Sequence, residues 1–443
     1  MPGPQGAPRH RTTRRRLPSR PARSIPAGDR NHQRRSHRHA HAPPQHLRDR
    51  GHIRPDRPIQ RNPSTQNHQA HPFQPDKGRP IMNSPTIMFP ETTKIKPAPR
   101  HTKEDLARFL NTIPYEPERH TAAEYAALGT RARTAYDRQR KMFLSGGITI
   151  HTPDFLQARL SLAESMNENI HPDRDPSGLI LTGDATLGKT TATRMLIRYV
   201  HDAYVRQFPD YANHGRVPIV FIEVPATCTG RALMCTFAHF FGMTVARTDT
   251  MEMLRQRVVD MMDRVGTRLV VVDELHNLSA ANKGNGESVD ILRSLHRDVF
   301  ATFLYAGIDL DTGDLLSGPR GRQIAARFTM MPMERYHPSS EADHEIWRGI
   351  IEQFEDALPL LNHKAGSLVA LSAYLLERTN GSIGSLGRLI NGTANGAVGT
   401  TEAVTRALLD KKTIDFAAET ARIETLARKT RSRQSAGRIG GTK

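Results

Sequence analysis

The sequence of 443 residues predicts an α/β fold built on a five-stranded parallel sheet. Two observations lead to this prediction: four short apolar runs with a weaker fifth, and helical stretches of 10–20 residues between them. Connections of that length are crossover helices, which leave consecutive strands parallel and cover both faces of the sheet. The expected strands are residues 179–184, 217–224, 268–275, 301–308 and 329–336.

Helical segments flank this predicted α/β core of residues 166–337 on both sides. An N-terminal helical extension over 100–165 is expected to contain helices near 104–110, 122–143 and 154–165. After the core, a C-terminal helical region over 338–427 is expected to contain four helices, and a basic tail over 428–443 follows it. The four predicted helices are residues 340–358, 365–379, 382–397 and 400–410.

The basic charge is concentrated at the start of the chain. Residues 1–80 hold 18 Lys and Arg against 4 Asp and Glu, or +14 of the total net charge of +18. The rest of the chain holds 45 basic and 41 acidic side chains, or only +4. A strongly basic chain indicates a polyanionic partner, first of all nucleic acid, but here the charge says little about the folded part.

Residues 1–81 are predicted to be a disordered leader rich in Arg, Pro and His. Positions 1–80 include 14 prolines and 9 histidines, with almost no apolar periodicity, so this segment cannot bury enough surface to fold. Three interpretations stay open. The leader is a basic arm for nucleic acid, it binds metal through His37, His39 and His41, or it is a solvated segment without function, with Met82 as the true start.

Several protein classes are excluded by the sequence. The two cysteines, Cys228 and Cys235, cannot form a disulfide framework and are expected to be core thiols; no zinc-binding spacing is present. No apolar run approaches the roughly 20 residues of a membrane helix, and the start has no apolar core of a secretory signal. We expect a cytoplasmic protein with no membrane partner.

A phosphate-binding loop follows the first predicted strand. Residues 183–190 read GDATLGKT, a complete match to GxxxxGK[ST] between a strand and a helix. In such a loop, backbone N–H groups surround the phosphates, Lys189 reaches the β- and γ-phosphates, and the Thr190 hydroxyl ligates Mg²⁺. The predicted ATP-binding residues here are Gly183, Asp184, Ala185, Thr186, Leu187, Gly188, Lys189, Thr190 and Thr191.

An acidic pair follows the third predicted strand. Asp273 ends the apolar run and is expected to hold Mg²⁺ opposite the phosphate loop, while Glu274 is the candidate catalytic carboxylate that polarises the attacking water. A whole predicted strand, residues 217–224, separates Lys189 from Asp273 in the sequence, which indicates an additional strand in the sheet. The sequence therefore predicts a Mg²⁺-dependent ATP hydrolase. The structural alternative is a helix cap or an ion pair after a buried strand.

His276 and Asn277 extend the acidic pair to DELHNL. A DExH run also occurs in superfamily 2 helicases, but the chain after Asp273 is too short to hold a second RecA-like domain together with the predicted helices. His276 is expected to satisfy local hydrogen bonds.

Over residues 100–425 the chain resembles the AAA+ ATPases of bacterial transposons, the TniB/TnsC group. The resemblance depends on the order of YDRQRKMF, HTPDF, LTGDATLGKTT, VVVDELHNLS, FLYAGI, GRQIAARF and GSIGSLGRLINGTANGAV. It implies an AAA+ module with a C-terminal helical lid. It also implies a ring or helical homo-oligomer that assembles with ATP on double-stranded DNA and recruits or activates a transposase.

The resemblance also implies roles for single residues. Arg327 matches the arginine that stabilises the γ-phosphate of a neighbouring subunit, with Arg320 and Arg322 as competitors, and Arg388 matches a sensor-2 arginine that binds the nucleotide. The sensor-1 position departs from the family because the fourth strand ends in YAGID, where Asp309 or Tyr305 could substitute.

Two other functions stay open at this point. One is a helicase-loader-like ATPase, and the other is a signalling or defence NTPase that uses the nucleotide as a switch. The residues that contact DNA are not specified by the sequence. Besides the basic tail, the candidates are Arg293, Arg297, Arg406, Lys411 and Lys412, with a solvated surface as the alternative.

Overall fold

The computed structural model describes residues 101–113, 115–171, 176–278, 287–313, 316, 319–424 and 427. The predicted leader over 1–81 and the basic tail over 428–443 lie outside these ranges, and so do the interpretations attached to them.

A five-stranded parallel sheet forms the first part of the fold, as the sequence predicts. Its strands are β1 (Gly178–Thr182), β2 (Ile219–Glu223), β3 (Leu269–Asp273), β4 (Thr302–Gly307) and β5 (Phe328–Pro332). Their order in the sheet is β2-β3-β4-β1-β5, with every neighbouring pair parallel. Strand β4 lies between β1 and β3, so the residues that follow β1 and β3 meet at the same edge of the sheet.

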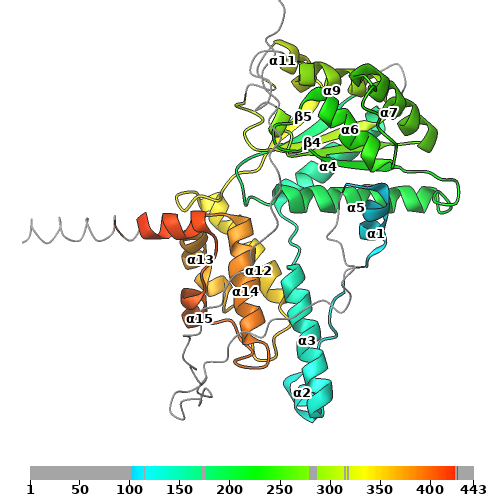
Figure 1. Ribbon diagram of the computed structural model, residues 1–443. Coiled ribbons are helices and arrows are strands. Elements are labelled where there is room, and N and C mark those ends of the chain that lie inside the picture. Colours follow the sequence, from blue (N-terminus) through cyan, green and yellow to red (C-terminus); the bar gives the residue numbers. More distant parts are fainter. Residues whose placement is uncertain are drawn as a thin grey trace, which may run out of the picture. The chain divides into compact units, whose positions relative to one another are not determined.

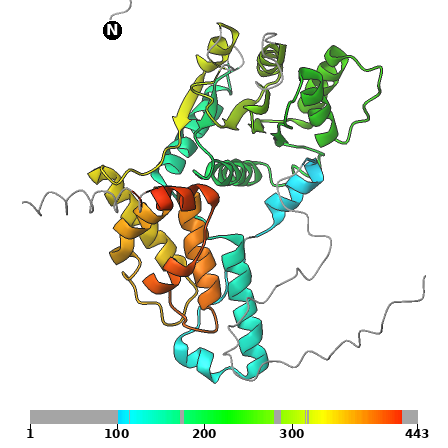
Figure 2. The same cartoon turned by 60° about the vertical axis from the view of Figure 1, so that its left-hand side comes forward.

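Helices cover both faces of this sheet (Figures 1 and 2). The chain runs from β1 to β2 in one direction across the sheet and returns through β3, β4 and β5 in the other. Right-handed crossovers therefore place α5 (Lys189–Gln207) on one face and the later helices on the opposite face. These later helices are α6 (Gly230–Phe240), α7 (Met251–Val265), α9 (Glu287–Asp298) and α11 (Pro319–Ala325).

The N-terminal extension contains four helices: α1 (Lys103–Asn111), α2 (Ala122–Ala127), α3 (Thr130–Gly146) and α4 (Pro153–Glu168). The single helix expected over 122–143 is therefore wrong. A capping box at Thr121 starts α2, and Leu128 and Gly129 adopt extended backbone before α3 begins.

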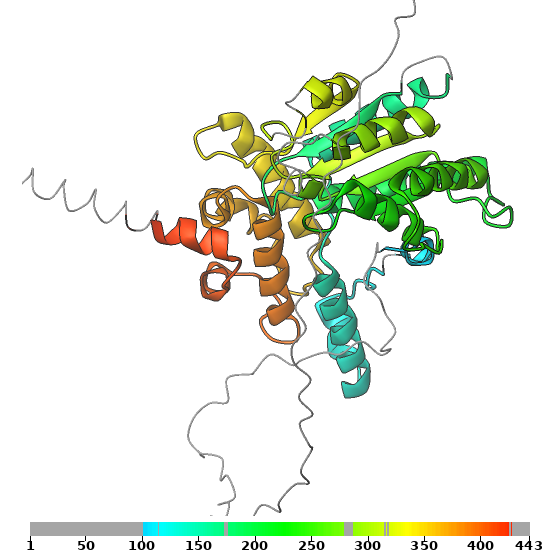
Figure 3. The same ribbon diagram turned by 45° about the horizontal axis from the view of Figure 1, so that its top comes forward.

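The extension divides between two hydrophobic cores. Leu106 of α1 and Phe155 of α4 belong to the core around the sheet, whereas Leu144 of α3 and Ile150 belong to the core of the C-terminal helices. Figure 3 shows α3 beside α14 (Ile383–Ala397), in agreement with their contacts. The extension thus contributes to both cores.

The C-terminal helices pack around the buried Trp347. They are α12 (Glu341–Ala357), the 3₁₀ turn η1 (Val369–Leu371), α13 (Ser372–Thr379), α14 and α15 (Arg406–Lys411). The helix expected over 400–410 begins only at Arg406, and a further helix over 416–424 was not predicted. The domain boundaries at 165/166 and 337/338 stay predictions.

A buried ion pair fastens α3 to the C-terminal helices. The Arg140 side chain is fully buried and donates to both carboxylate oxygens of Glu402, at 2.6 and 2.9 Å, and to Asp137 at 2.6 Å. Removing one partner of such a pair leaves an uncompensated buried charge, which destabilises a protein by roughly 3–5 kcal/mol.

None of the helices in the described ranges is both long and apolar enough to cross a membrane.

Candidate nucleotide site

The GxxxxGK[ST] segment forms a tight loop between β1 and α5. Gly183 (φ 141°) and Gly188 (φ 91°) adopt backbone conformations that disfavour side chains. A Cβ on Gly183 would lie 2.2 Å from the carbonyl oxygen of Met333, so this close approach of two backbone segments requires glycine. The sequence therefore builds a backbone cradle of the kind that surrounds phosphates.

Lys189 bends back over this cradle. Its Nζ donates to the carbonyl oxygens of Gly183 and Asp184, both at 2.6 Å. Partial burial lowers the pKa of Lys189, although the carboxylates of Glu274 and Asp273 act in the opposite direction. Lys189 thus lies in the electrostatic field of the acidic pair, as the parallel strand order requires.

Asp273 is buried at the end of β3, with 4% of its surface exposed. Burial raises the pKa of its carboxyl to about 6, and the hydrogen bond from the Glu274 backbone N–H, at 2.8 Å, opposes this rise. The Thr190 side chain is exposed on the facing helix start. A carboxylate and a hydroxyl are oxygen donors of the kind that Mg²⁺ takes, and it usually completes its shell with water and substrate phosphates. Within the described ranges, no group of three or more His, Cys, Asp and Glu could hold a metal ion alone.

Glu274 is held in a left-handed conformation (φ 56°) directly after the strand. Its Oε2 lies 3.4 Å from Nε2 of His276, whose Nδ1 accepts the Ile308 N–H at 3.3 Å. The prediction that His276 satisfies local hydrogen bonds is confirmed, and one of its contacts is with the candidate catalytic carboxylate.

Several strained backbone conformations lie at the carboxyl ends of the strands. Of the six non-glycine residues with positive φ in the described ranges, Thr186, Glu274 and Asp309 all belong to segments that follow strands β1, β3 and β4. Such conformations each cost about 1–3 kcal/mol and concentrate at functional sites.

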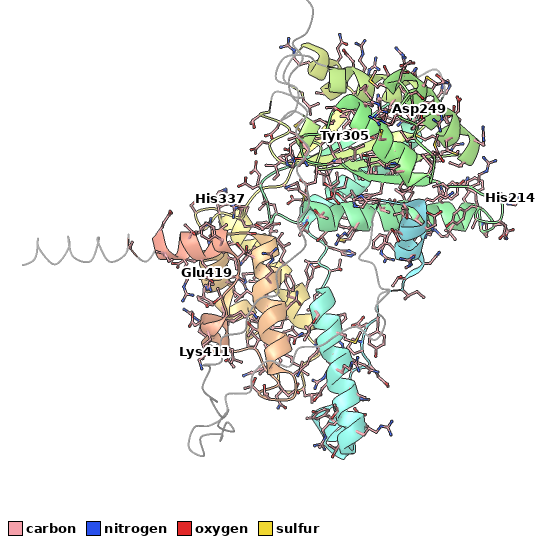
Figure 4. All side chains as sticks on the ribbon, viewed as in Figure 1. His214, Asp249, Tyr305, His337, Lys411 and Glu419 are labelled. Carbon is pink, nitrogen blue, oxygen red and sulfur yellow. The ribbon has the colours of Figure 1, made fainter. Side chains whose placement is uncertain are left out.

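The structure distinguishes the two candidate residues for the sensor-1 position, Tyr305 and Asp309. Tyr305 is fully buried within β4 and its ring stacks on Phe328 at 4.8 Å, so its hydroxyl cannot reach a nucleotide (Figure 4). Asp309 is exposed beyond the end of β4, and its charge raises the pKa of Lys189. The Tyr305 alternative is wrong because β4 is covered on both faces.

Sequence reasoning missed the contact between the C-terminal helices and the phosphate loop. Gly384 donates its backbone N–H to the Thr186 carbonyl at 2.8 Å, and the Ser382 hydroxyl donates to the same oxygen at 2.9 Å. Ser382 is also the N-cap of α14. The closely spaced glycines of GSIGSLG were the only local signal, since Gly381 and Gly384 both approach another backbone closely.

Arg335 was also missed. It follows β5, and its Nη2 lies 3.5 Å from the Asp184 carboxylate of the phosphate loop. No spacing in the sequence relates these two residues.

Arg327 is exposed between α11 and β5. Its carbonyl oxygen accepts the N–H of Gly178 at 3.2 Å, at the start of β1. The phosphate loop follows the other end of β1, roughly 13 Å away at about 3.3 Å per residue. Arg327 is therefore far from the phosphate loop of its own chain. Arg322 is exposed on α11, and the Arg320 side chain lies outside the described residues.

The other predicted basic residues come from three different helices, α9, α14 and α15. Arg388 is exposed on α14, where its charge lowers the pKa of Asp415. Arg293 and Arg297 are exposed on α9, with Arg297 paired to Asp298. Arg406 pairs with Asp410, and Lys411 lies next to Lys412 at the end of α15; Figure 4 labels Lys411.

Of the two cysteines, Cys228 is buried, which raises the pKa of its thiol to about 11, and Cys235 is partly buried.

A cavity of about 210 Å³ adjoins the phosphate loop. Its lining comes from residues within 148–155, from Gly188 and the first turns of α5, including Thr191 and Met195, and from Phe354 and α14. The lining is predominantly apolar, as in most ligand pockets.

Comparison with solved structures gives distant likenesses. The Aeropyrum pernix ORC1 protein in complex with DNA is 18% identical, over 64% of this chain and 67% of that chain, with a TM-score of 0.43. The Aeropyrum pernix ORC2 protein in ADPNP and ADP complexes is 15% identical, over 69% and 70%, with a TM-score of 0.44. The Thermotoga maritima RuvB Holliday junction branch migration motor is 14% identical, over 59% and 68%, with a TM-score of 0.36.

No curated protein matches the sequence. The sequence model of the family described as Bacterial TniB protein matches residues 149–338, which include all five strands, the phosphate loop and the acidic pair. The resemblance inferred from the motif order is confirmed. Residues 149–338 are therefore similar to the family described as Bacterial TniB protein, and within them the parallel sheet, the phosphate loop and the acidic pair have the arrangement of a P-loop nucleotide-binding fold.

Proposed function

We propose that this chain is a Mg²⁺-dependent ATP hydrolase that assembles on double-stranded DNA and regulates a transposase. One observation carries the enzymatic part. Lys189, Asp273 and Glu274 come from two segments that are distant in the sequence, and the order β3-β4-β1 brings them to one edge of the sheet, where their charges interact.

Each of these residues has a definite task in the proposed reaction. The Lys189 ammonium group donates to two carbonyl oxygens of the phosphate loop, so it already lies where the phosphates would bind. When ATP binds, phosphate oxygens replace these carbonyls as its acceptors. Thr190 and Asp273 hold Mg²⁺, which supplies charge neutralisation when it is bound. Glu274 accepts a hydrogen bond from the attacking water and orients it.

The location of Arg327 supports an oligomer. An arginine about one strand length away from its own phosphate loop is better suited to the loop of another copy. A cation donated by a neighbour makes hydrolysis depend on assembly. In our proposal the assembly is a ring or a helix on DNA.

The transposition role is supported by the match of residues 149–338 to the TniB family model and by the basic charge of residues 1–80. A polybasic segment binds DNA through its phosphates, which makes the affinity fall steeply with salt. Recruitment or activation of a transposase is the part of the proposal that depends on the family alone.

ATP turnover with and without double-stranded DNA tests the proposal. The wild type should hydrolyse ATP only with Mg²⁺, and DNA should stimulate turnover. Lys189→Ala should lose ATP binding, whereas Glu274→Gln should bind ATP, turn over far more slowly and remain on DNA. Turnover that ignores DNA would favour a signalling NTPase, and binding to a replicative helicase would favour a helicase loader.

A further inference from the structure

A chain of hydroxyl groups connects the phosphate loop with the start of helix 416–424. The Ser382 hydroxyl oxygen lies 2.9 Å from both the carbonyl oxygen and the side-chain oxygen of Thr186. Its other neighbours are the backbone nitrogen and the hydroxyl oxygen of Ser385, at 3.3 and 3.2 Å. The Ser385 hydroxyl also donates to Oδ2 of Asp415, at 2.6 Å. Both serines are buried, so their hydroxyl groups depend on these neighbours for hydrogen bonds.

The Ser382 hydroxyl has more neighbours than it can satisfy alone. A hydroxyl has one proton to donate and two lone pairs with which to accept. The Ser382 proton goes to the Thr186 carbonyl oxygen, because a carbonyl can only accept. Three donors then compete for the two lone pairs: the Ser385 N–H, the Ser385 O–H and the Thr186 O–H. One of these three protons must point elsewhere.

Asp415 removes one of the competing donors. An ionised carboxylate only accepts hydrogen bonds, and 2.6 Å is a typical distance for a hydroxyl that donates to one. Burial raises the pKa of Asp415, but the hydrogen bonds from the Ser385 hydroxyl and the Ala418 N–H outweigh it and hold the pKa below the ordinary value of an aspartate. The ionised Asp415 therefore holds the Ser385 proton. Both lone pairs of Ser382 stay available for the Ser385 N–H and the Thr186 O–H.

We infer that Asp415 is a positioning residue of the phosphate loop: by holding the Ser385 proton, it lets Ser382 bind both oxygen atoms of Thr186. The φ of Thr186 is 66°, a conformation that a β-branched residue keeps only when its surroundings fix it. The backbone of this loop surrounds the phosphates in the proposed nucleotide site, on which the inference rests. Asp415 acts on the loop although it comes more than 200 residues later in the sequence.

The test is a double-mutant cycle in which equilibrium titration with fluorescent ATP measures the affinity for ATP. Asp415→Asn has the same shape, and its oxygen can still accept the Ala418 N–H that caps helix 416–424. Its amide group, however, donates toward Ser385, which redirects the Ser385 proton to Ser382 and displaces the Thr186 hydroxyl. ATP should bind about three- to tenfold more weakly, the value of one hydrogen bond.

Ser385→Ala separates this mechanism from a loss of stability. Without the Ser385 hydroxyl, only two donors remain for the two lone pairs of Ser382. This variant should bind ATP within about twofold of the wild type, and adding Asp415→Asn to it should change the affinity no further. A change that only weakened the helix cap would lower the affinity in both backgrounds.

Asp410→Asn is the matched control. The Asp410 carboxylate of α15 also accepts a hydroxyl proton, from Tyr374 at 2.8 Å. This variant loses the same charge without touching Ser385, so it should bind ATP like the wild type. A folded Asp415→Asn protein with wild-type affinity overturns the inference, as does an equal loss with and without the Ser385 hydroxyl. If the wild type binds no ATP, the proposed nucleotide site itself is wrong.

Discussion

Nε2 of His276 lies 3.4 Å from Oε2 of Glu274, while Nδ1 of the same ring accepts the backbone N–H of Ile308 at 3.3 Å. Because Nδ1 is an acceptor, the ring proton is on Nε2, where it faces the carboxylate. Ile308 follows β4 and Glu274 follows β3, so one imidazole joins the ends of two neighbouring strands. His276 thereby fixes the direction of the candidate catalytic carboxylate.

Two isosteric substitutions separate the halves of this contact. His276→Gln places a donor near Nε2 and should keep the Glu274 contact, whereas His276→Asn places an acceptor near Nδ1 and should keep the Ile308 bond. We expect kcat to fall about three- to tenfold in the Asn variant, at unchanged ATP affinity, and less in the Gln variant, since the Asn variant loses the 3.4 Å contact between the ring and the carboxylate. Steady-state kinetics and ATP binding measure this. Equal loss in both variants, together with a lower Tm, would show that His276 is only structural.

A second prediction concerns the backbone contact between α14 and the phosphate loop. A Cβ on Gly384 would lie 2.4 Å from the backbone oxygen of Thr186, so Gly384→Ala must displace one of the two segments. We expect about a five- to tenfold loss of ATP affinity, because the backbone hydrogen bond to Thr186 is lost with the contact.

Gly396→Ala provides the control for this change. Gly396 belongs to the same helix, but a Cβ there meets nothing within 4 Å. Alanine stabilises an open helical site by roughly 0.5–1 kcal/mol relative to glycine, so this variant should melt slightly higher and bind ATP normally. If both variants bind ATP like the wild type, the contact with Thr186 is not needed for the nucleotide site.

A third prediction concerns acid stability of the C-terminal helices. The buried Glu355 carboxylate accepts the backbone N–H groups of Leu368 and Gly366, at 2.8 and 2.9 Å, and Nε2 of His363 at 2.9 Å. Burial alone raises the pKa of Glu355, but these hydrogen bonds outweigh it and hold the pKa below the ordinary value of a glutamate. A lowered pKa means that the carboxylate stabilises the fold above about pH 4.5 and that this contribution is lost as the pH falls through the folded-state pKa.

Chemical denaturation between pH 7 and pH 3 measures this contribution. Glu355→Gln should be less stable than the wild type at pH 7, and the difference in unfolding free energy should shrink as the pH falls below about 4.5. The exposed Glu352, on the same helix, supplies Glu352→Gln as the control, with little effect at any pH. A constant difference across the range would mean that the charge of Glu355 does not stabilise the helices.

The sequence predicts the parts of this molecule whose signals are local. The first four strands are contiguous apolar runs, and the loop over 183–190 and the pair Asp273–Glu274 are contiguous motifs, so the sequence locates them closely, whereas the weaker fifth run was predicted to extend four residues beyond Pro332, where β5 ends. The break at Gly129 was missed because α2 and α3 share a continuous helical pattern. Tyr305 remained an alternative because the sequence places it in a buried strand but does not show which neighbours surround its hydroxyl.

Residues from distant segments could not be predicted in the same way. Ser382 and Gly384 approach the phosphate loop only because α14, which comes much later in the chain, packs beside it. A single serine or glycine on a helix has many structural uses, and its spacing from the loop carries no chemical meaning. Tertiary packing, not a motif, assigns these residues.

The last prediction concerns Arg327 and the oligomer. The exposed Arg327 lies beside the start of β1, and the phosphate loop follows the end of that strand, so each copy would present its arginine to a different copy. An arginine supplied by a neighbour accelerates phosphoryl transfer by about 10³–10⁵-fold in related reactions. Arg327→Ala should therefore bind ATP normally and lose DNA-stimulated hydrolysis, whereas Lys189→Ala should lose both.

Mixing the two variants distinguishes action between subunits from action within one. Neither variant alone contains a complete site, but in a mixed oligomer an intact Arg327 from a Lys189→Ala subunit faces an intact phosphate loop in an Arg327→Ala subunit. Part of the activity should return on mixing, and its amount should follow the mixing ratio. If hetero-oligomers form, as crosslinking can establish, and the mixture stays inactive, Arg327 does not act between subunits. The same experiment with Arg320→Ala and Arg322→Ala then identifies which neighbouring arginine does.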